Sequence, residues 1–542
     1  MNHTTIIRAL LAASALTLSG AAIAQAKADP SAQEAMPDPS DAAADAAIQN
    51  AAATDDAKAK IELLSQQVEA LQAQLEIVKS AMVKATPSWK GAALFEDKDA
   101  GWSFKPKGTL QFDAGYVGFP RGNELRGTVS GLNFGNLGFN TRARRAIIGA
   151  EGTLPGGFSY NVEFNLAQAT VDYEDILFAY QHKGSPIRVT VGNFYPMSSL
   201  ETVTSSKFTS FMERPSFTDA FNLNRRLGVS VALVDPKTDR YSLTAGLFSQ
   251  PINDFVGSNS TTPNFQRTGW EAGVRGTFSP RMGDTQLHLG ASFHHRENQR
   301  EAQGAQYRAR PLLQTTDQRF VDTGSIAAKG DDIVGLEFAA IHKSFHFAAE
   351  AQKLWVRHAY TAAEAALLNT TAGTNDTVSG TVFLNNNPSF EGGYAELGYY
   401  LTGESRGYKG GKFDRTKVLH PFDQGGWGAL QVNGRVDYIN LNDRVADAPA
   451  GSSVATSVSA PYYVNGGKQL GYMIGLVWSP MDYVRFTAQY AHLEVTGGPR
   501  ATVNTAVAPL APNGLLPLGT TTPANERKYS VDTAGLRAQI DF

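Results

Sequence analysis

The chain has 542 residues, a formal net charge of −3, 52 glycines and no cysteine. The small negative charge argues against bulk electrostatic binding to nucleic acid, and without cysteine or a spaced histidine motif we expect no metal and no cofactor. The mean hydropathy is −0.25, and beyond the N-terminus no run approaches the ~18 apolar residues of a membrane-spanning helix.

Residues 1–24 have the layout of a secretory signal peptide. Arg8 is their only charged residue, a short apolar run follows it, and residues 22–24 (AIA) fit an A-x-A cleavage site. A membrane anchor is less favoured because the apolar run is short and small residues follow it. We therefore expect export in a Gram-negative bacterium, with cleavage after Ala24 or, alternatively, after Ala26.

The next two segments differ in composition. Residues 25–59 are rich in alanine, aspartate and proline and are predicted to be a disordered linker. Residues 60–85 carry an unbroken heptad pattern, which predicts a coiled-coil helix. Its apolar seam consists of Ile61, Leu64, Val68, Leu71, Leu75, Val78 and Met82. Three heptads are marginal for an isolated coiled coil. We therefore favour a coiled coil between subunits that are already held together elsewhere. The alternative is an amphipathic helix that packs on its own chain.

From about residue 104 the apolar period changes to two, which predicts β-strands. In residues 158–166 (FSYNVEFNL), for example, apolar side chains alternate with polar ones. Several segments have the ~9–11 residues of a tilted spanning strand. Sixteen segments are predicted: 109–118, 142–152, 157–168, 171–182, 187–195, 226–234, 240–249, 269–279, 285–295, 332–342, 345–356, 390–401, 427–441, 468–479, 482–493 and 528–542. They predict a 16-stranded antiparallel β-barrel over residues 104–542.

The connections support this barrel. Short turns rich in proline and glycine follow the even-numbered segments, and most long connections follow odd-numbered ones, with residues 402–426 as the exception. Outer-membrane barrels have this asymmetry, with the short turns in the periplasm. The last segment ends on Phe542, as in many bacterial outer-membrane proteins. An even strand count leaves both chain ends in the periplasm, where the coiled coil would lie.

Five arginines lie inside the predicted strands between less polar neighbours. On the lipid face near the bilayer centre each would cost ~2–4 kcal/mol, so we expect all five to face the lumen. They are Arg188, Arg275, Arg435, Arg485 and Arg537. Acidic residues of the same strand phase can balance them, so these arginines alone do not indicate anion selectivity.

Nine other cations are the candidates for anion contact in the lumen. They cluster at the start of the second segment, in and beside the connection 196–225, and in the connection 296–331. The candidates are Arg142, Arg144, Arg145, Lys207, Arg214, Arg225, Arg226, Arg308 and Arg310. A charge pair at 4 Å is worth ~1 kcal/mol in water and ~4 kcal/mol at an intermediate dielectric, so spaced cations can attract phosphate without trapping it.

Three stretches resemble the phosphate-selective porin family: residues 142–165, 191–231 and 392–441. The segment TGESRGY, residues 402–408, is particularly characteristic. The resemblance implies a 16-stranded trimeric barrel, loops that fold inward and a basic lumen for phosphate-like anions. It also implies that Lys207, Arg214, Arg225 and Arg226 match the basic third-loop region of the family. Arg308 and Arg310 fall where the family can place a basic fifth loop, without a motif match.

We therefore predict a passive outer-membrane porin that prefers anions, with phosphate or polyphosphate as the solute. The expected partners are outer-membrane lipid, small anions such as phosphate, and further copies of the chain in a homotrimer. The alternatives are a general or sugar porin, and a structural outer-membrane anchor that acts through its periplasmic coiled coil. An enzyme is not expected, because no G-x-S-x-G motif or rim triad accompanies the adjacent pair His294 and His295.

Overall fold

A computed structural model describes most of the chain as two separate units, one ending at Val83 and the other beginning at Lys84. The predicted signal peptide and most of the predicted linker lie outside the described residues. The described residues are 57–76, 88–89, 91–122, 137–167, 171–221, 223–249, 268–298, 304–371, 384, 386–444, 464–499 and 525–542.

The N-terminal unit contains a helix over residues 57–76. The helix takes in the last three residues assigned to the linker, because Ala57, Lys58 and Ala59 are good helix formers. The described positions of the heptad seam are 50–67% exposed: Ile61, Leu64, Val68, Leu71 and Leu75. The remaining two, Val78 and Met82, lie outside the described residues, and in the single chain the seam is uncovered.

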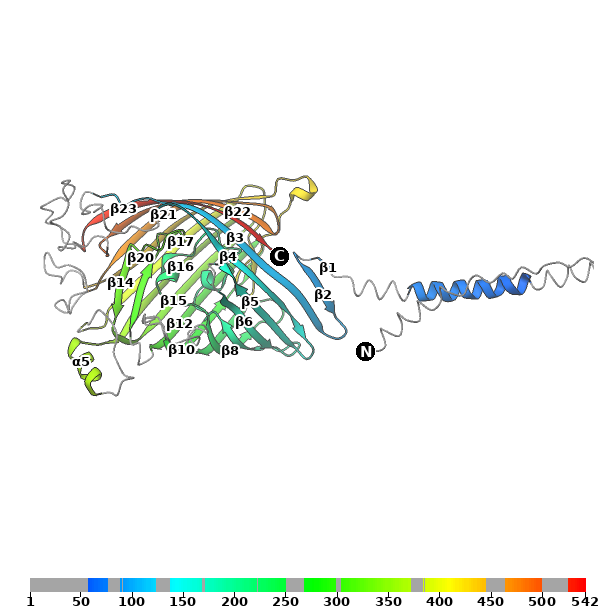
Figure 1. The fold of residues 1–542 in the computed structure, drawn as a ribbon, viewed down its shortest axis with the longest axis horizontal. Helices are drawn as coiled ribbons and strands as arrows, with labels where there is room; N and C mark the ends of the chain where they lie inside the picture. Colours follow the sequence, from blue (N-terminus) through cyan, green and yellow to red (C-terminus); the bar gives the residue numbers. More distant parts are fainter. Residues whose placement is uncertain are drawn as a thin grey trace, which may run out of the picture. The chain divides into compact units, whose positions relative to one another are not determined.

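The second unit is a closed antiparallel barrel of sixteen wall strands, as predicted (Figure 1). The last strand pairs with the first, from Thr533 opposite Val117 to Asp541 opposite Thr109. The wall strands are β3 (Trp102–Val117), β4 (Gly138–Leu154), β5 (Phe158–Asn165), β6 (Asp172–Tyr180), β7 (Ile187–Phe194), β8 (Arg226–Val234), β9 (Tyr241–Phe248), β10 (Thr268–Phe278), β12 (Thr285–Asn298), β15 (Ala328–His342), β16 (Phe345–Ala359), β17 (Ser389–Tyr400), β20 (Ala429–Asp443), β21 (Val464–Met481), β22 (Val484–Thr496) and β23 (Lys528–Asp541).

The remaining elements lie in the connections or before the barrel. Two short strands precede the wall, and β2 extends the sheet by pairing with β3. The remaining elements are β1 (Ser88–Trp89), β2 (Ala93–Asp97), α3 (Leu200–Val203), α4 (Ser216–Ala220), β11 (Arg281–Met282), β13 (Ala305–Ala309), β14 (Val321–Ile326), α5 (Ala362–Thr371), β18 (Gly407–Lys409), β19 (Lys412–Asp414) and η4 (Phe422–Gln424).

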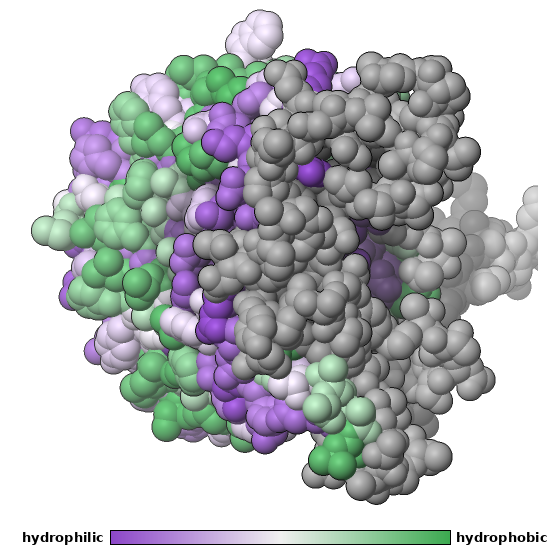
Figure 2. Space-filling model, turned by 90° about the vertical axis from the view of Figure 1, so that its left-hand side faces the viewer, coloured by the Kyte–Doolittle hydropathy of each residue, from purple (hydrophilic) through white to green (hydrophobic). Residues whose placement is uncertain are grey.

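The barrel is apolar on its outside and polar within. On β23, Ala534, Leu536 and Ile540 are exposed, whereas Arg537 and Gln539 are buried. The same alternation on the other strands places large apolar side chains outward, and hydrophobic residues gather on the outer flank in Figure 2. An apolar outer band around a polar interior is the arrangement that lets a barrel face lipid.

The two ends of the barrel differ. At one end most strands are joined by turns of a few residues, such as 155–157 and 343–344, and the C-terminus lies at this end (Figure 1). Exposed aromatic pairs, including Phe158 with Tyr180 at 4.8 Å and Phe345 with Tyr399 at 4.3 Å, join neighbouring strands near these turns. Such aromatic rings mark the membrane interface of a barrel. The long connections lie at the other end.

Candidate functional site: a charged cavity within the barrel

The loop between β7 and β8 crosses the barrel interior. Where α3 begins, the backbone N–H groups of Leu200 and Glu201 donate to the Glu350 carboxylate on β16, at 2.8 and 2.9 Å. Farther along, the N–H of Ser216 donates to Asp437 on β20 at 3.0 Å. The β7–β8 loop is therefore fixed to the far wall, because carboxylates from two strands satisfy its backbone donors.

A second segment, the β13–β14 hairpin (residues 304–327), also folds inward from the long-loop end. The Leu312 carbonyl accepts a 3.0 Å hydrogen bond from Gln489 on β22. Leu313 is fully buried and packs against Gly115 and Gly535 of the wall. Any larger residue at these positions would clash with it, because an added Cβ would lie 2.6 Å (Gly115) or 2.7 Å (Gly535) from the Leu313 side chain. The two glycines thus provide the space that the hairpin occupies.

The third inward segment comes from the opposite end. It is the β18–β19 hairpin, residues 402–428, which follows β17 and is the long connection that broke the pattern of short turns. Phe413 is 1% exposed, and its N–H donates to Thr204 on the β7–β8 loop at 3.3 Å. The Arg406 guanidinium lies 3.5 Å from the centre of the Phe413 ring. The β18–β19 hairpin is therefore packed against the β7–β8 loop inside the barrel.

Buried arginines fill much of the space between these segments and the wall. Each is at most 7% exposed and has a carboxylate within 3 Å. The pairs are Arg226 with Glu271, Arg275 with Glu337, Arg296 with Asp331, Arg435 with Glu396, and Arg537 with Asp113. Because each positive charge has its own buried carboxylate, this part of the interior is a neutral, packed structure.

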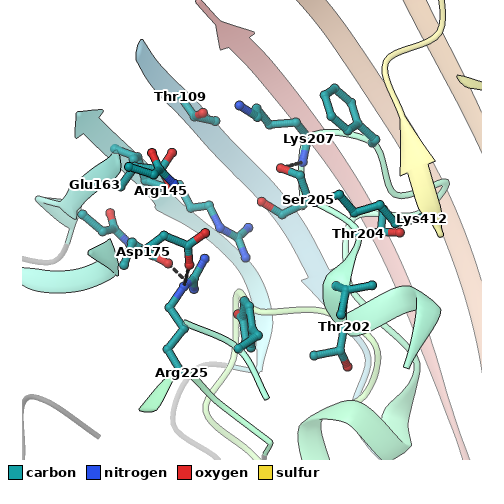
Figure 3. Close-up of a pocket in the computed structure, with 18 of the residues that line it drawn as sticks. Thr109, Arg145, Glu163, Asp175, Thr202, Thr204, Ser205, Lys207, Arg225 and Lys412 are labelled. Atoms are coloured by element: carbon teal, nitrogen blue, oxygen red, sulfur yellow. Dashed lines mark hydrogen bonds and ion pairs between the residues drawn. The ribbon is translucent and has the colours of Figure 1, made fainter. Parts of the chain in front are cut away.

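The open part of the interior is a cavity of about 1310 Å³. Its wall is formed by β3 to β7 on one side and by the β7–β8 loop and the β18–β19 hairpin on the other. In Figure 3, Arg145, Glu163 and Asp175 lie on the strand side, and Lys207 and Lys412 lie across the gap. The lining includes eleven cationic and eight acidic side chains, which leaves an excess of positive charge.

Apart from Arg214, whose guanidinium donates to backbone carbonyls, five cations of this lining form no ion pair within the described residues. They come from five parts of the chain and converge on the cavity: Lys105, Arg145, Arg188, Lys207 and Lys412. Arg145 donates to the neutral amide oxygen of Gln111 at 2.7 Å. Burial lowers the pKa of Lys207 and of Lys412 from the ordinary lysine value. These charges are available to a solute because no carboxylate of the described residues is paired with them.

The predicted candidates occupy three kinds of position. Arg145 and Lys207 belong to the unpaired set, whereas Arg144, Arg225 and Arg310 line the cavity but are paired with Glu213, with Glu174 and Asp175, and with Asp219, respectively. Arg214 also lines the cavity, where it donates to the backbone carbonyls of Glu201, Thr202 and Thr204.

The other three candidates do not line the cavity. Arg142 donates to the Gln314 carbonyl at 2.8 Å, and Arg308 lies on β13. Arg226 is 1% exposed beside Glu271, so its charge is enclosed and we do not retain it as an anion contact.

Sequence reasoning missed Lys105, Lys107 and Lys412 and treated Arg188 as ordinary lining. Lys105 and Lys107 precede the predicted start of the first segment at 109, but β3 begins at Trp102 and carries both into the cavity. Lys105 and Lys107 lie four and two residues before the inward Thr109, so they have the same strand phase. This spacing could have predicted the longer strand. Lys412 had no such signal, since only the folding of the β18–β19 hairpin brings it inward.

The strand arginines face inward, as expected from the cost of placing them in lipid. Arg537 pairs with Asp113 and Arg435 pairs with Glu396 inside the barrel, and Arg485 donates to the Lys207 carbonyl on the β7–β8 loop at 2.7 Å. Among the described residues, no helix is long and apolar enough to cross a bilayer.

The family model for phosphate-selective porin O and P matches residues 123–513. The chain belongs to this family. It is 36% identical to an uncharacterized protein of Caulobacter vibrioides over 86% of this chain and 78% of that protein. It is 27% identical to Porin O of Pseudomonas aeruginosa over 74% of this chain and 85% of that protein. The outer membrane channel DcaP of Acinetobacter baumannii has a TM-score of 0.43 at 11% identity, covering 83% of this chain and 99% of that one.

The barrel and its family identify an outer-membrane porin. Since the short turns of such barrels face the periplasm, the β18–β19 hairpin enters the porin from the periplasmic side, and the β7–β8 loop and β13–β14 hairpin enter from outside. The cavity is the part of the lumen between these inward segments and the wall strands β3 to β7.

Proposed function

We propose that the porin prefers anions and conducts phosphate or polyphosphate. The observation that supports this proposal is a set of five cavity cations that form no ion pair in the part of the chain that the structure describes: Lys105, Arg145, Arg188, Lys207 and Lys412. An anion that passes through the cavity meets positive charge from the strands on one side and from the β7–β8 loop and β18–β19 hairpin on the other.

The strength of these contacts suits passage rather than capture. One cation at 4 Å attracts an anion by ~1 kcal/mol in water and ~4 kcal/mol at an intermediate dielectric. Thr202 and Ser205 also line the cavity, and their hydroxyl groups can donate hydrogen bonds to phosphate oxygens. Several moderate contacts in series allow binding that is favourable enough to enter and weak enough to leave.

The proposed assembly is a homotrimer whose helices over residues 57–76 associate in the periplasm through the heptad seam. The uncovered seam, 50–67% exposed in the single chain, supports this association. The barrels would hold the three helices at a high local concentration, which offsets the marginal stability of a short coiled coil.

Single-channel recording in a planar bilayer tests the anion preference. We expect a reversal potential favouring chloride over potassium, and a chloride current that falls as inorganic phosphate is added. The double substitution Lys207→Gln and Lys412→Gln should reduce both effects, because loss of ~1 kcal/mol of attraction at each site corresponds to about fivefold in anion partition.

The matched control is Lys183→Gln, which removes an exposed lysine from the turn between β6 and β7 at the same end of the barrel. This control should leave selectivity unchanged. A cation-selective wild-type channel would contradict the anion preference. A non-selective channel whose current is blocked by sugars but not by phosphate would favour the sugar porin instead.

A further inference from the structure

The cavity contains a feature that anion conduction does not require, namely a row of carboxylates along one wall. Strands β4, β5 and β6 contribute five acidic side chains to the lining: Glu151, Glu163, Asp172, Glu174 and Asp175. Lys107 contacts Glu151 and Glu163, each at 3.1 Å, and Arg225 pairs with Glu174 and Asp175. Lys105, Arg145 and Arg188 lie on the same side of the cavity, so the strand wall presents charges of both signs.

The opposite side of the cavity contributes two further lysines. Lys207 on the β7–β8 loop and Lys412 on the β18–β19 hairpin form no ion pair within the described chain. Burial lowers the pKa of Lys412, and Asp175 on the strand side opposes that change, so the two groups interact electrostatically across the cavity. Burial likewise lowers the pKa of Lys207, and this change is opposed by Asp541 on β23 and, to a smaller extent, by Glu163 on the strand side. In Figure 3, Lys207 and Lys412 lie across the gap from Glu163 and Asp175, and no ion pair joins either lysine to these two carboxylates.

A gap of this kind suits a solute with charges of both signs. A carboxylate row repels a simple phosphate, yet it can bind an ammonium group while Lys207 and Lys412 bind a phosphate. We infer that the cavity selects small phosphate esters that carry an amine, with the phosphate between Lys207 and Lys412 and the ammonium toward Glu163 and Asp175. The inference rests on the proposed anion channel and narrows its solute class.

O-phosphoethanolamine and ethyl phosphate test this selection as blockers of the chloride current at pH 7. The two esters share the phosphate and differ by the amine. Net charge alone predicts stronger block by ethyl phosphate, which is the more negative of the two. We expect the opposite order, with O-phosphoethanolamine blocking at a severalfold lower concentration. Equal block, or stronger block by ethyl phosphate, would overturn the inference.

Substitution of the carboxylates separates this role from a general effect of charge. Glu163→Gln and Asp175→Asn should strengthen block by inorganic phosphate and by ethyl phosphate but weaken block by O-phosphoethanolamine. Asp284→Asn, in an exposed turn and 68% exposed at the side chain, is the matched control and should change none of them. If the substitutions strengthened block by all three compounds, the two-charge site would be wrong, but the proposed anion channel would stand. Absence of block by every phosphate would instead contradict the anion channel itself.

Discussion

Arg537 on the last wall strand forms a two-point ion pair with Asp113 on the first, with both nitrogen–oxygen distances at 2.7 Å. The same guanidinium donates to the Met212 carbonyl and contacts Glu213 on the β7–β8 loop. One buried side chain therefore joins the two strands that close the barrel and also fixes the loop that narrows it. Burial alone would raise the pKa of Glu213, but Arg144 and Arg537 hold it well below the ordinary value.

Arg537→Ala should destabilise the barrel strongly, because it leaves Asp113 as an uncompensated buried charge. Breaking a buried pair in this way costs about 3–5 kcal/mol. The free energy of unfolding from lipid bilayers in urea is the measurement. Adding Asp113→Asn should recover part of the loss, since it removes the orphaned charge.

Arg121→Ala is the matched control, because its side chain is 74% exposed and 3.8 Å from Asp532. An exposed pair of this kind contributes about 0–1 kcal/mol. Equal losses for Arg537→Ala and Arg121→Ala would show that burial of the Arg537 pair is not what stabilises the closure.

Anion selectivity should fall as the pH rises from about 7 to 10. The fall should begin at a lower pH than it would if the cavity lysines had the ordinary lysine pKa. Burial lowers the pKa of Lys207 and of Lys412, so both side chains lose their positive charge at a lower pH than an exposed lysine. Reversal potentials measured across this range give the profile. The double substitution Lys207→Arg and Lys412→Arg should flatten it, because arginine stays charged. A profile unchanged by the arginines would assign the titration to other groups.

Phe413→Ala should loosen the β18–β19 hairpin. Truncating a buried phenylalanine costs about 3–5 kcal/mol, and here the loss falls on the contact of the hairpin with Arg406 and the β7–β8 loop. We expect larger and noisier single-channel currents, since the hairpin narrows the periplasmic side of the lumen. Phe413→Leu keeps most of the volume and should resemble the wild type. Quiet currents of normal size from Phe413→Ala would show that the hairpin does not limit conductance.

Leu64→Asp together with Leu71→Asp should weaken association of the helices without altering the pore. Both side chains lie on the exposed seam, so a charge there disfavours burial between subunits. Chemical crosslinking and the thermal midpoint of subunit dissociation are the measurements, with single-channel conductance as the check on the barrel. Glu69→Lys, off the seam, is the control. Unchanged association would mean that the seam contacts something other than a second copy.

The barrel was predictable because its signal is local. Each strand must alternate apolar and polar residues to lie between lipid and lumen, so the period appears directly in segments such as 158–166 and 528–542. The ends of strands were less predictable. The segment that carries Lys105 and Lys107 extends β3 toward the short-turn end, where pairing with β4 and β2, rather than alternation alone, sets its start.

Arg225 and Arg226 mark the limit of prediction for the site. The sequence by itself determined the barrel, its inward phase and the presence of many cations in the inward connections, because these depend on residue type and spacing. Only the tertiary structure decided which cations stay available. Arg225 lines the cavity beside Glu174 and Asp175, whereas its neighbour Arg226 is enclosed with Glu271. Lys412, at the same cavity, has no ion pair among the residues that the structure describes. Whether a charge is neutralised depends on a partner far away in the chain, and folding alone brings that partner near.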